Sequence, residues 1–208
     1  NTCRQLTDLE PLRGMPLETL DLRNTQVANL TPLIGLPVKT LDLSRAPVQD
    51  FSPLGELPLE QCYLQFTRIR DLGIFRGRPL KSLCLWGCTG TRNYAVLADI
   101  PTLENVILPE DYRALPPNDY AAIGSLRNHP ALRQIAAEVV NGMGYEATGL
   151  KEAFWQDWDL EETVFQTLRK KGITFGLTRV PGGEDKLHIT NQPIRDHSLL
   201  KELPLVDL

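Results

Sequence analysis

The sequence predicts an α/β solenoid, in which a curved parallel β-sheet is built from stacked copies of one short unit. Residues 17–37 and 38–58 have the same length of 21 residues and nearly the same pattern, and residues 59–79 repeat it. A fourth copy begins at Leu80 and carries a small insertion. Because one such unit cannot bury its own leucines, the copies must stack on one another.

The leucine positions predict one strand in each unit. Leu20 and Leu22 belong to the pattern L-x-x-L-x-L, which is typical of a leucine-rich-repeat solenoid. Alternation along a strand turns both leucines inward and Asp21 outward. We expect Leu20, Leu41 and Leu83 to be almost wholly buried. The predicted strands lie near residues 17–22, 38–43, 59–64, 80–85, 103–108 and 132–137.

The second half of each unit is expected to return on the convex side as a short irregular or helical segment. Pro32 and Pro53 oppose a long regular helix there. After the fifth repeat the pattern lengthens into a helical region. Asn118 is a candidate cap for a helix that contains Tyr120 and stops before Pro130.

The order of these patterns predicts three regions. Residues 1–137 form the solenoid, which opens with a partial repeat, and residues 138–172 form a helical closing segment. Residues 173–208 contain a β-hairpin and the start of a second, truncated repeat block. We therefore expect the chain to be part of a longer protein, and its open repeat ends are predicted to self-associate.

Composition argues against several classes of partner. The formal net charge is −4 and no basic stripe is seen, which argues against nucleic acid. No apolar run is long enough to span a bilayer, and no leader segment is seen. The compartment stays open: we slightly favour the cytoplasm, and a membrane-anchored or exported parent protein is the alternative.

The cysteines and the rest of the chain predict no metal and no cofactor. Cys62 stands in a leucine row, where a free cysteine behaves as a small buried hydrophobe. Cys84 and Cys88 lack the spacing of a zinc site. A secreted disulfide scaffold is the less favoured alternative.

The sequence predicts a non-catalytic chain. The glycine-rich loop, the V-A-I-K lysine and the H-R-D loop of protein kinases are missing. Asp71 begins a D-L-G that imitates the kinase D-F-G, but it lies in the same repeat frame as Asn29. His129, His188 and His197 belong to different elements, and no base stands beside a nucleophile.

The outward face of the sheet is the predicted binding surface. Its central column passes from acidic to apolar side chains, and exposed aromatic rows are typical binding anchors. We expect a protein or peptide ligand on this concave face, anchored by Tyr63 and Trp86. In the alternative, residues 109–172 or another domain cover the face. The candidate binding residues are Asp21, Arg23, Asp42, Tyr63, Gln65, Cys84, Trp86 and Ile107.

These motifs also carry a family resemblance. The phrase L-x-x-L-x-L-x-x-T-x-V-x-x-L-x-P-L-x-G-L-P, the segment LRNHPALRQI and the helix AFWQDWD resemble the leucine-rich-repeat regions of planctomycete-type bacteria. Such regions are often attached to serine/threonine protein kinases, so the resemblance implies the sensing or scaffolding part of a larger kinase. The chain is also similar to internalin-like adhesins, with a shorter period and Thr, Ala or Cys at the usual Asn position. The functional alternatives are a surface adhesion module and a purely structural spacer.

Overall fold

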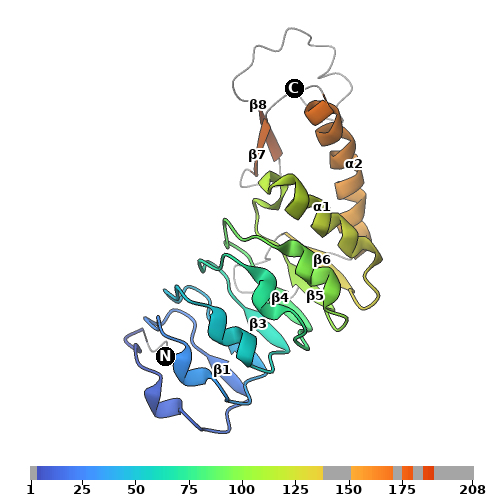
Figure 1. Cartoon of the computed structure of the whole chain (residues 1–208). Coiled ribbons are helices and arrows are strands. Elements are labelled where there is room, and N and C mark those ends of the chain that lie inside the picture. Colours follow the sequence, from blue (N-terminus) through green and yellow to red (C-terminus); the bar gives the residue numbers. More distant parts are fainter. Residues whose placement is uncertain (1–3, 138–150, 171–174, 180–184, 190–208) are drawn as a thin grey trace. The chain divides into compact units, whose positions relative to one another are not determined.

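The fold is known from a computed structural model that describes residues 4–137, 151–170, 175–179 and 185–189. The chain divides into two compact units, Asn1–Lys151 and Glu152–Leu208. The first unit is a leucine-rich-repeat solenoid with a curved parallel sheet that does not close on itself (Figure 1). The second unit contains most of a long helix and a two-stranded hairpin.

The sheet of the first unit follows chain order, and each strand is parallel to the next. Its strands are β1 (Thr19–Asp21), β2 (Thr40–Asp42), β3 (Gln61–Tyr63), β4 (Ser82–Cys84), β5 (Asn105–Ile107) and β6 (Gln134–Ala136). Each strand lies within the segment predicted for it. Leu20 pairs with Leu41, and Leu41 with Cys62, so the register of one repeat period is confirmed.

The return segments are short 3-10 helices, joined in the later repeats by one α-helix. The segments are η1 (Glu10–Leu12), η2 (Thr31–Leu33), η3 (Ser52–Glu56), η4 (Leu72–Phe75), η5 (Tyr94–Asp99), η6 (Tyr112–Ala114), α1 (Pro117–Ser125) and η7 (Leu126–Asn128). Pro32 and Pro53 stand in the first turn of η2 and η3, where a missing amide hydrogen costs least. The predicted short convex segments are therefore confirmed.

The hydrophobic core lies between the sheet and the return segments. Leu41 and Leu83 are buried as predicted. The prediction for Leu20 is wrong, because this side chain remains partly exposed. Leu20 belongs to β1, which has a neighbouring strand on one side only, so it lacks the second layer of side chains that covers Leu41.

Asp and Asn side chains begin four of the return segments at intervals of one repeat period. In each case a side-chain oxygen accepts a hydrogen bond from the amide two residues later, as in an Asx turn. The four residues are Asp8, Asn29, Asp50 and Asp71. Asp71 thus caps η4, which agrees with the interpretation of its D-L-G sequence as part of the repeat.

Helix α1 begins at Pro117, so the prediction that Asn118 caps it is wrong. Proline favours the first helical position because its fixed φ suits a helix, and Asn118 falls one residue inside the helix. The acidic residue that follows it, Asp119, caps a different segment. Its Oδ1 accepts hydrogen bonds from the amides of Asn93 (2.8 Å) and Tyr94 (3.1 Å) at the start of η5.

The second unit contains helix α2 (Lys151–Lys170) with the antiparallel strands β7 (Phe175–Arg179) and β8 (Asp185–Ile189). Trp155 and Trp158 are buried, and their ring centroids lie 5.5 Å apart in an edge-on contact. Of the predicted second repeat block, which begins at Leu187, only Leu187–Ile189 at the end of β8 belong to the described residues, and the three-region division stays a prediction.

Candidate interaction surfaces of the repeat unit

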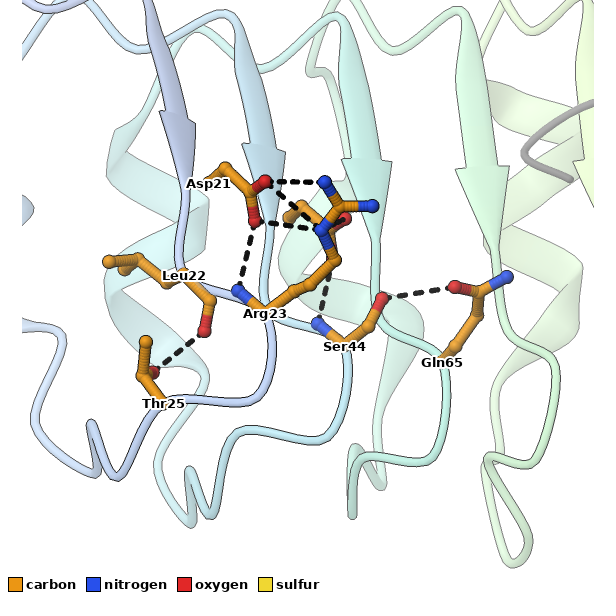
Figure 2. A network of polar contacts seen from close by, with 7 residues as sticks. Asp21, Leu22, Arg23, Thr25, Ser44 and Gln65 are labelled. Atoms are coloured by element: carbon orange, nitrogen blue, oxygen red, sulfur yellow. Dashed lines mark hydrogen bonds and ion pairs between the residues drawn. The ribbon is translucent and has the colours of Figure 1, made fainter. Parts of the chain in front are cut away.

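Arg23 links the first two strands at the acidic end of the concave face. It follows Asp21 by two residues and therefore leaves the chain on the same side. Its Nη2 lies 2.6 Å from Asp21 Oδ2, and its Nε lies 3.6 Å from Oδ2 of Asp42 on the next strand. Figure 2 shows the guanidinium group held against the carboxylate of Asp21. Asp21 is exposed, whereas Asp42 is buried.

Hydrogen bonds to the following turns fix the same carboxylates. Asp42 Oδ1 accepts from the amide of Ser44 (2.9 Å), and the Ser44 hydroxyl donates to Gln65 Oε1 (3.1 Å). Figure 2 shows the side chains of Ser44 and Gln65 pointing toward one another across neighbouring repeats. Gln65 is buried and already has a partner. The polar side chains at this end of the face already bond to one another. A ligand would therefore find them fixed in place before it binds.

The apolar end of the concave column is buried. Cys84, Ile107 and Ala136 expose 1%, 2% and 6% of their surfaces and form one cluster, with Tyr63 and Trp86 packed against it. Strand pairing places Cys84 beside Ile107, both members of the predicted outward column, and continues that column to Ala136. Cys84 and Ile107 are therefore closed to a ligand in this structure, and Tyr63 and Trp86 retain partly exposed surface.

The buried cysteines are poor nucleophiles. Cys62 lies in the core, as predicted. Burial raises the pKa of the Cys84 thiol to about 12 and that of Cys88 to about 11. Both thiols stay protonated at neutral pH, and the thiolate is the reactive form. Among the residues that the structure describes, no cluster of three His, Cys, Asp or Glu side chains could hold a metal ion.

His129 acts as a structural bridge. Its Nδ1 accepts a hydrogen bond from the amide of Leu132 (3.2 Å), so the ring proton belongs on Nε2. That nitrogen lies 2.9 Å from the carbonyl oxygen of Ile100 and donates to it. With both ring nitrogens engaged and the ring buried, His129 of the fifth repeat is bonded to Ile100 of the fourth and to Leu132 at the start of the sixth.

A second surface lies on the turns that follow the strands. The residue at one equivalent turn position has a positive φ in four successive repeats: Asn24 (58°), Arg45 (63°), Phe66 (57°) and Gly87 (71°). This left-handed backbone suits glycine and is tolerated by asparagine, but it is rare for a bulky side chain. The turns stack, because the amides of Arg45 and Phe66 donate to carbonyl groups of the following repeat.

The ring of Phe66 lies against its neighbours in this stack. The guanidinium carbon of Arg45 is 4.0 Å from the ring centroid, a cation–π contact. A Cβ atom placed on Gly87 would lie 2.4 Å from Cδ1 of the ring. Phe66 nevertheless exposes 43% of its surface.

The chain continues from Phe66 in an alternating pattern. Thr67 and Ile69 are buried, and Arg68 and Arg70 are exposed. Together with Arg45, these exposed residues form a group that the sequence analysis missed. The signal was available as F-x-R-x-R, with an arginine one period before the phenylalanine.

An alternating column of charges marks the entrance to the strands. Its members are Glu18, Lys39, Glu60, Lys81 and Glu104. Lys39 Nζ lies 2.9 Å from Glu18 Oε1, and Lys81 Nζ lies 2.6 Å from Glu60 Oε2. The hydrogen bond and charge of Lys81 lower the pKa of Glu60. The sequence analysis missed this column, which a comparison of the residues before each strand would reveal.

Comparison with known proteins finds similar structures only. No protein-family model matches the chain, and no curated protein matches it. Internalin C2 of Listeria monocytogenes aligns with 50% of this chain and 58% of its own length, at 25% identity and a TM-score of 0.41. A second internalin of Listeria monocytogenes, inlF, aligns with 66% of this chain and 54% of its own, at 19% identity and a TM-score of 0.36. The chain thus spans little more than half the length of each internalin.

Among the described segments, no helix is both long enough and apolar enough to cross a membrane.

Proposed function

We propose that the chain is a non-catalytic protein–protein interaction module that binds a protein or peptide segment on the concave face. The observation that supports this is the outward column of the sheet. It joins the ion-paired network around Arg23 to two partly exposed aromatic side chains, Tyr63 and Trp86. An open sheet face of this kind suits an extended segment better than an enclosed metabolite.

The two aromatic residues have the support that a binding anchor needs. Tyr63 and Trp86 pack against the buried cluster of Cys84, Ile107 and Ala136, which restricts their motion. A side chain that is already held in place loses little entropy when a partner covers it. Large aromatic side chains are also enriched among the residues that dominate binding energy. The Arg23 network would set the charge preference of the ligand.

The proposal can be tested with the full chain and a displayed peptide library. Peptides selected on the natural chain should bind the double variant Tyr63→Ala with Trp86→Ala at least about tenfold more weakly. The control variant Met15→Ala with Ile34→Ala removes two exposed apolar side chains elsewhere and should bind normally. Equal binding by the Tyr63 and Trp86 variant, with its thermal midpoint unchanged, would place the ligand on another surface.

The finer assignment is that the module senses or scaffolds within a larger bacterial serine/threonine kinase. Its support is the resemblance of the repeat phrase and the AFWQDWD helix to kinase-attached repeat regions. An adhesion module of the internalin type is the alternative. Reading the complete gene for a kinase domain or an export signal distinguishes the two, and it also tests the slight preference for the cytoplasm.

A purely structural spacer is the second candidate function. The burial of Cys84 and Ile107 favours it, because it shows that part of the concave column serves packing. In that case, substituting Tyr63 and Trp86 would lower the thermal midpoint, and no selected peptide would distinguish the variants. Self-association through the repeat ends stays a prediction, which light scattering over a range of concentrations can test.

A further inference from the structure

Phe66 occupies a position where the fold itself favours other residues. Its backbone is left-handed, with a φ of 57°. The equivalent positions in the other repeats hold Asn24, Arg45 and Gly87, of which Asn24 and Gly87 accept this conformation with less strain. Phe66 also leaves 43% of its surface in solvent. Backbone strain and aromatic exposure at one residue are reasons to look for a function at that residue.

Three arginines accompany Phe66 in the repeat pattern: Arg45 one period before it, and Arg68 and Arg70 two and four residues after it. Arg45, Arg68 and Arg70 are exposed, and none of the ion pairs found among the described residues involves any of the three. Arg45 lies against the ring of Phe66, as described above. The guanidinium of Arg70 lies beside Gly90, since a Cβ there would be 2.9 Å from its Nη1.

Nearby carboxylates already bind backbone amides. Asp50 accepts from the amide of Ser52, and Asp71 accepts from that of Gly73. Glu110 accepts from the amide of Gly87. These carboxylates keep their charge, but none of them forms an ion pair with Arg45, Arg68 or Arg70 among the described residues, so the three cations are open to a carboxylate of a partner.

We propose that Arg45, Phe66, Arg68 and Arg70 form a second docking surface, which binds an extended acidic segment of a partner protein. We call these four residues the Arg–Phe surface. Arginine binds carboxylates through paired hydrogen bonds, and exposed aromatic and arginine side chains dominate many interfaces. This surface lies on the turns and acts independently of the concave ligand.

The spacing of the arginines defines the acidic segment further. Arg68 and Arg70 are two residues apart in a stretch whose side chains alternate between buried and exposed. Two residues of extended chain span about 7 Å, which is also the spacing of carboxylates at every second residue of an extended peptide. The fitting partner therefore carries Asp or Glu at alternate positions. Only one of the four residues, Phe66, is aromatic, whereas sites for single-stranded nucleic acid use several aromatic side chains that stack on successive bases.

The test is fluorescence anisotropy with the full chain and labelled peptides of defined sequence. A peptide that alternates Glu and Thr should bind, and its affinity should fall as salt is raised. A peptide that alternates Lys and Thr should not bind. The proposal is overturned if the Glu peptide fails to bind at low salt, or if a single-stranded oligothymidylate binds more tightly than the Glu peptide.

Variants then distinguish binding at this surface from attraction by the overall charge of the chain. Arg68→Gln with Arg70→Gln should weaken binding of the Glu peptide at least about tenfold. The control Arg4→Gln with Arg133→Gln removes the same charge from two other exposed positions and should bind like the natural chain. An equal loss in the control would show that net charge alone attracts the peptide, and would overturn the proposal.

Two more variants separate binding from packing. Phe66→Asn introduces the residue that already accepts this backbone at position 24, so the chain should stay folded and bind the Glu peptide more weakly. Tyr63→Ala with Trp86→Ala should leave binding of the Glu peptide unchanged, even if it abolishes binding on the concave face. Full binding by Phe66→Asn would contradict the role of the ring. Loss of binding in the Tyr63 and Trp86 variant would contradict a separate surface.

Discussion

Gly87→Ala should destabilise the repeat unit for two separable reasons. The φ of Gly87 is +71°, so any side chain there strains the backbone. The new Cβ would also lie 2.4 Å from Cδ1 and 2.8 Å from Cε1 of Phe66. The ring has limited room to yield, because the guanidinium carbon of Arg45 lies 4.0 Å from its centroid.

The size of each contribution can be estimated from the structure. A left-handed alanine costs about 1 to 2 kcal/mol, and forcing an extra methyl into a filled site typically costs about 1 to 3 kcal/mol. Gly87→Ala should therefore cost about 2 to 5 kcal/mol in the free energy of unfolding. Gly35→Ala is the matched control, since Gly35 has a φ of +83° and nothing lies within 4 Å of its Cβ position. It should cost only the backbone part.

Urea unfolding followed by circular dichroism measures these differences. The double variant Gly87→Ala with Phe66→Ala should regain about 1 to 3 kcal/mol relative to the sum of the single changes, because the ring that the new methyl group would meet is gone. Alanine at position 66 keeps the left-handed strain, so the cycle isolates the side-chain contact. Equal costs for Gly87→Ala and Gly35→Ala, or strict additivity in the cycle, would refute this account of the stacked turns.

Two further predictions concern the core and a cap. Leu41→Ala should cost about 2 to 5 kcal/mol in the free energy of unfolding because it leaves a cavity, whereas Leu20→Ala should cost about 1 to 2 kcal/mol because Leu20 is already partly exposed. Urea midpoints measure both costs, and equal values would argue against the open end at β1. Asp119→Ala should lower the free energy of unfolding by about 1 to 2 kcal/mol, because it removes the acceptor of the amides of Asn93 and Tyr94 at the start of η5. Asp119→Asn keeps an acceptor oxygen and should retain most of this stability. Thermal melts that show the two variants alike would contradict the cap.

The constant length of the repeats explains why the sheet could be predicted from the sequence. Each unit repeats the same inward leucines, so the pairing of Leu20, Leu41 and Cys62 follows from counting residues. The burial of Leu20 could not be obtained in this way, because it depends on how many layers lie beside a repeat. The cap of η5 was also missed. Asp119 reaches it from helix α1, whereas the earlier caps belong to their own repeats.

The sequence predicts which side of the sheet the candidate binding residues face, but it does not predict whether their side chains reach solvent. Alternation alone places Asp42, Cys84 and Ile107 on the outward side of the strands. Whether an outward side chain meets water depends on the packing around it, and these three residues are buried. The Arg–Phe surface was missed for a different reason. Phenylalanine is typical of strands, and nothing in its identity indicates a left-handed backbone at Phe66.

The alternating charges at the strand entrances impose a parity rule on the length of the array. If residues 38–58 were deleted, Glu18 would come to lie beside Glu60, and two like charges would meet. If residues 38–79 were deleted, Glu18 would lie beside Lys81, and the attraction would be restored. Insertions of one repeat between Glu18 and Lys81 meet the same obstacle, and insertions of two avoid it. A protein with this column can therefore gain or lose repeats most easily in pairs. When the solenoid is lengthened or shortened by design, changes of two repeats should be tolerated better than changes of one.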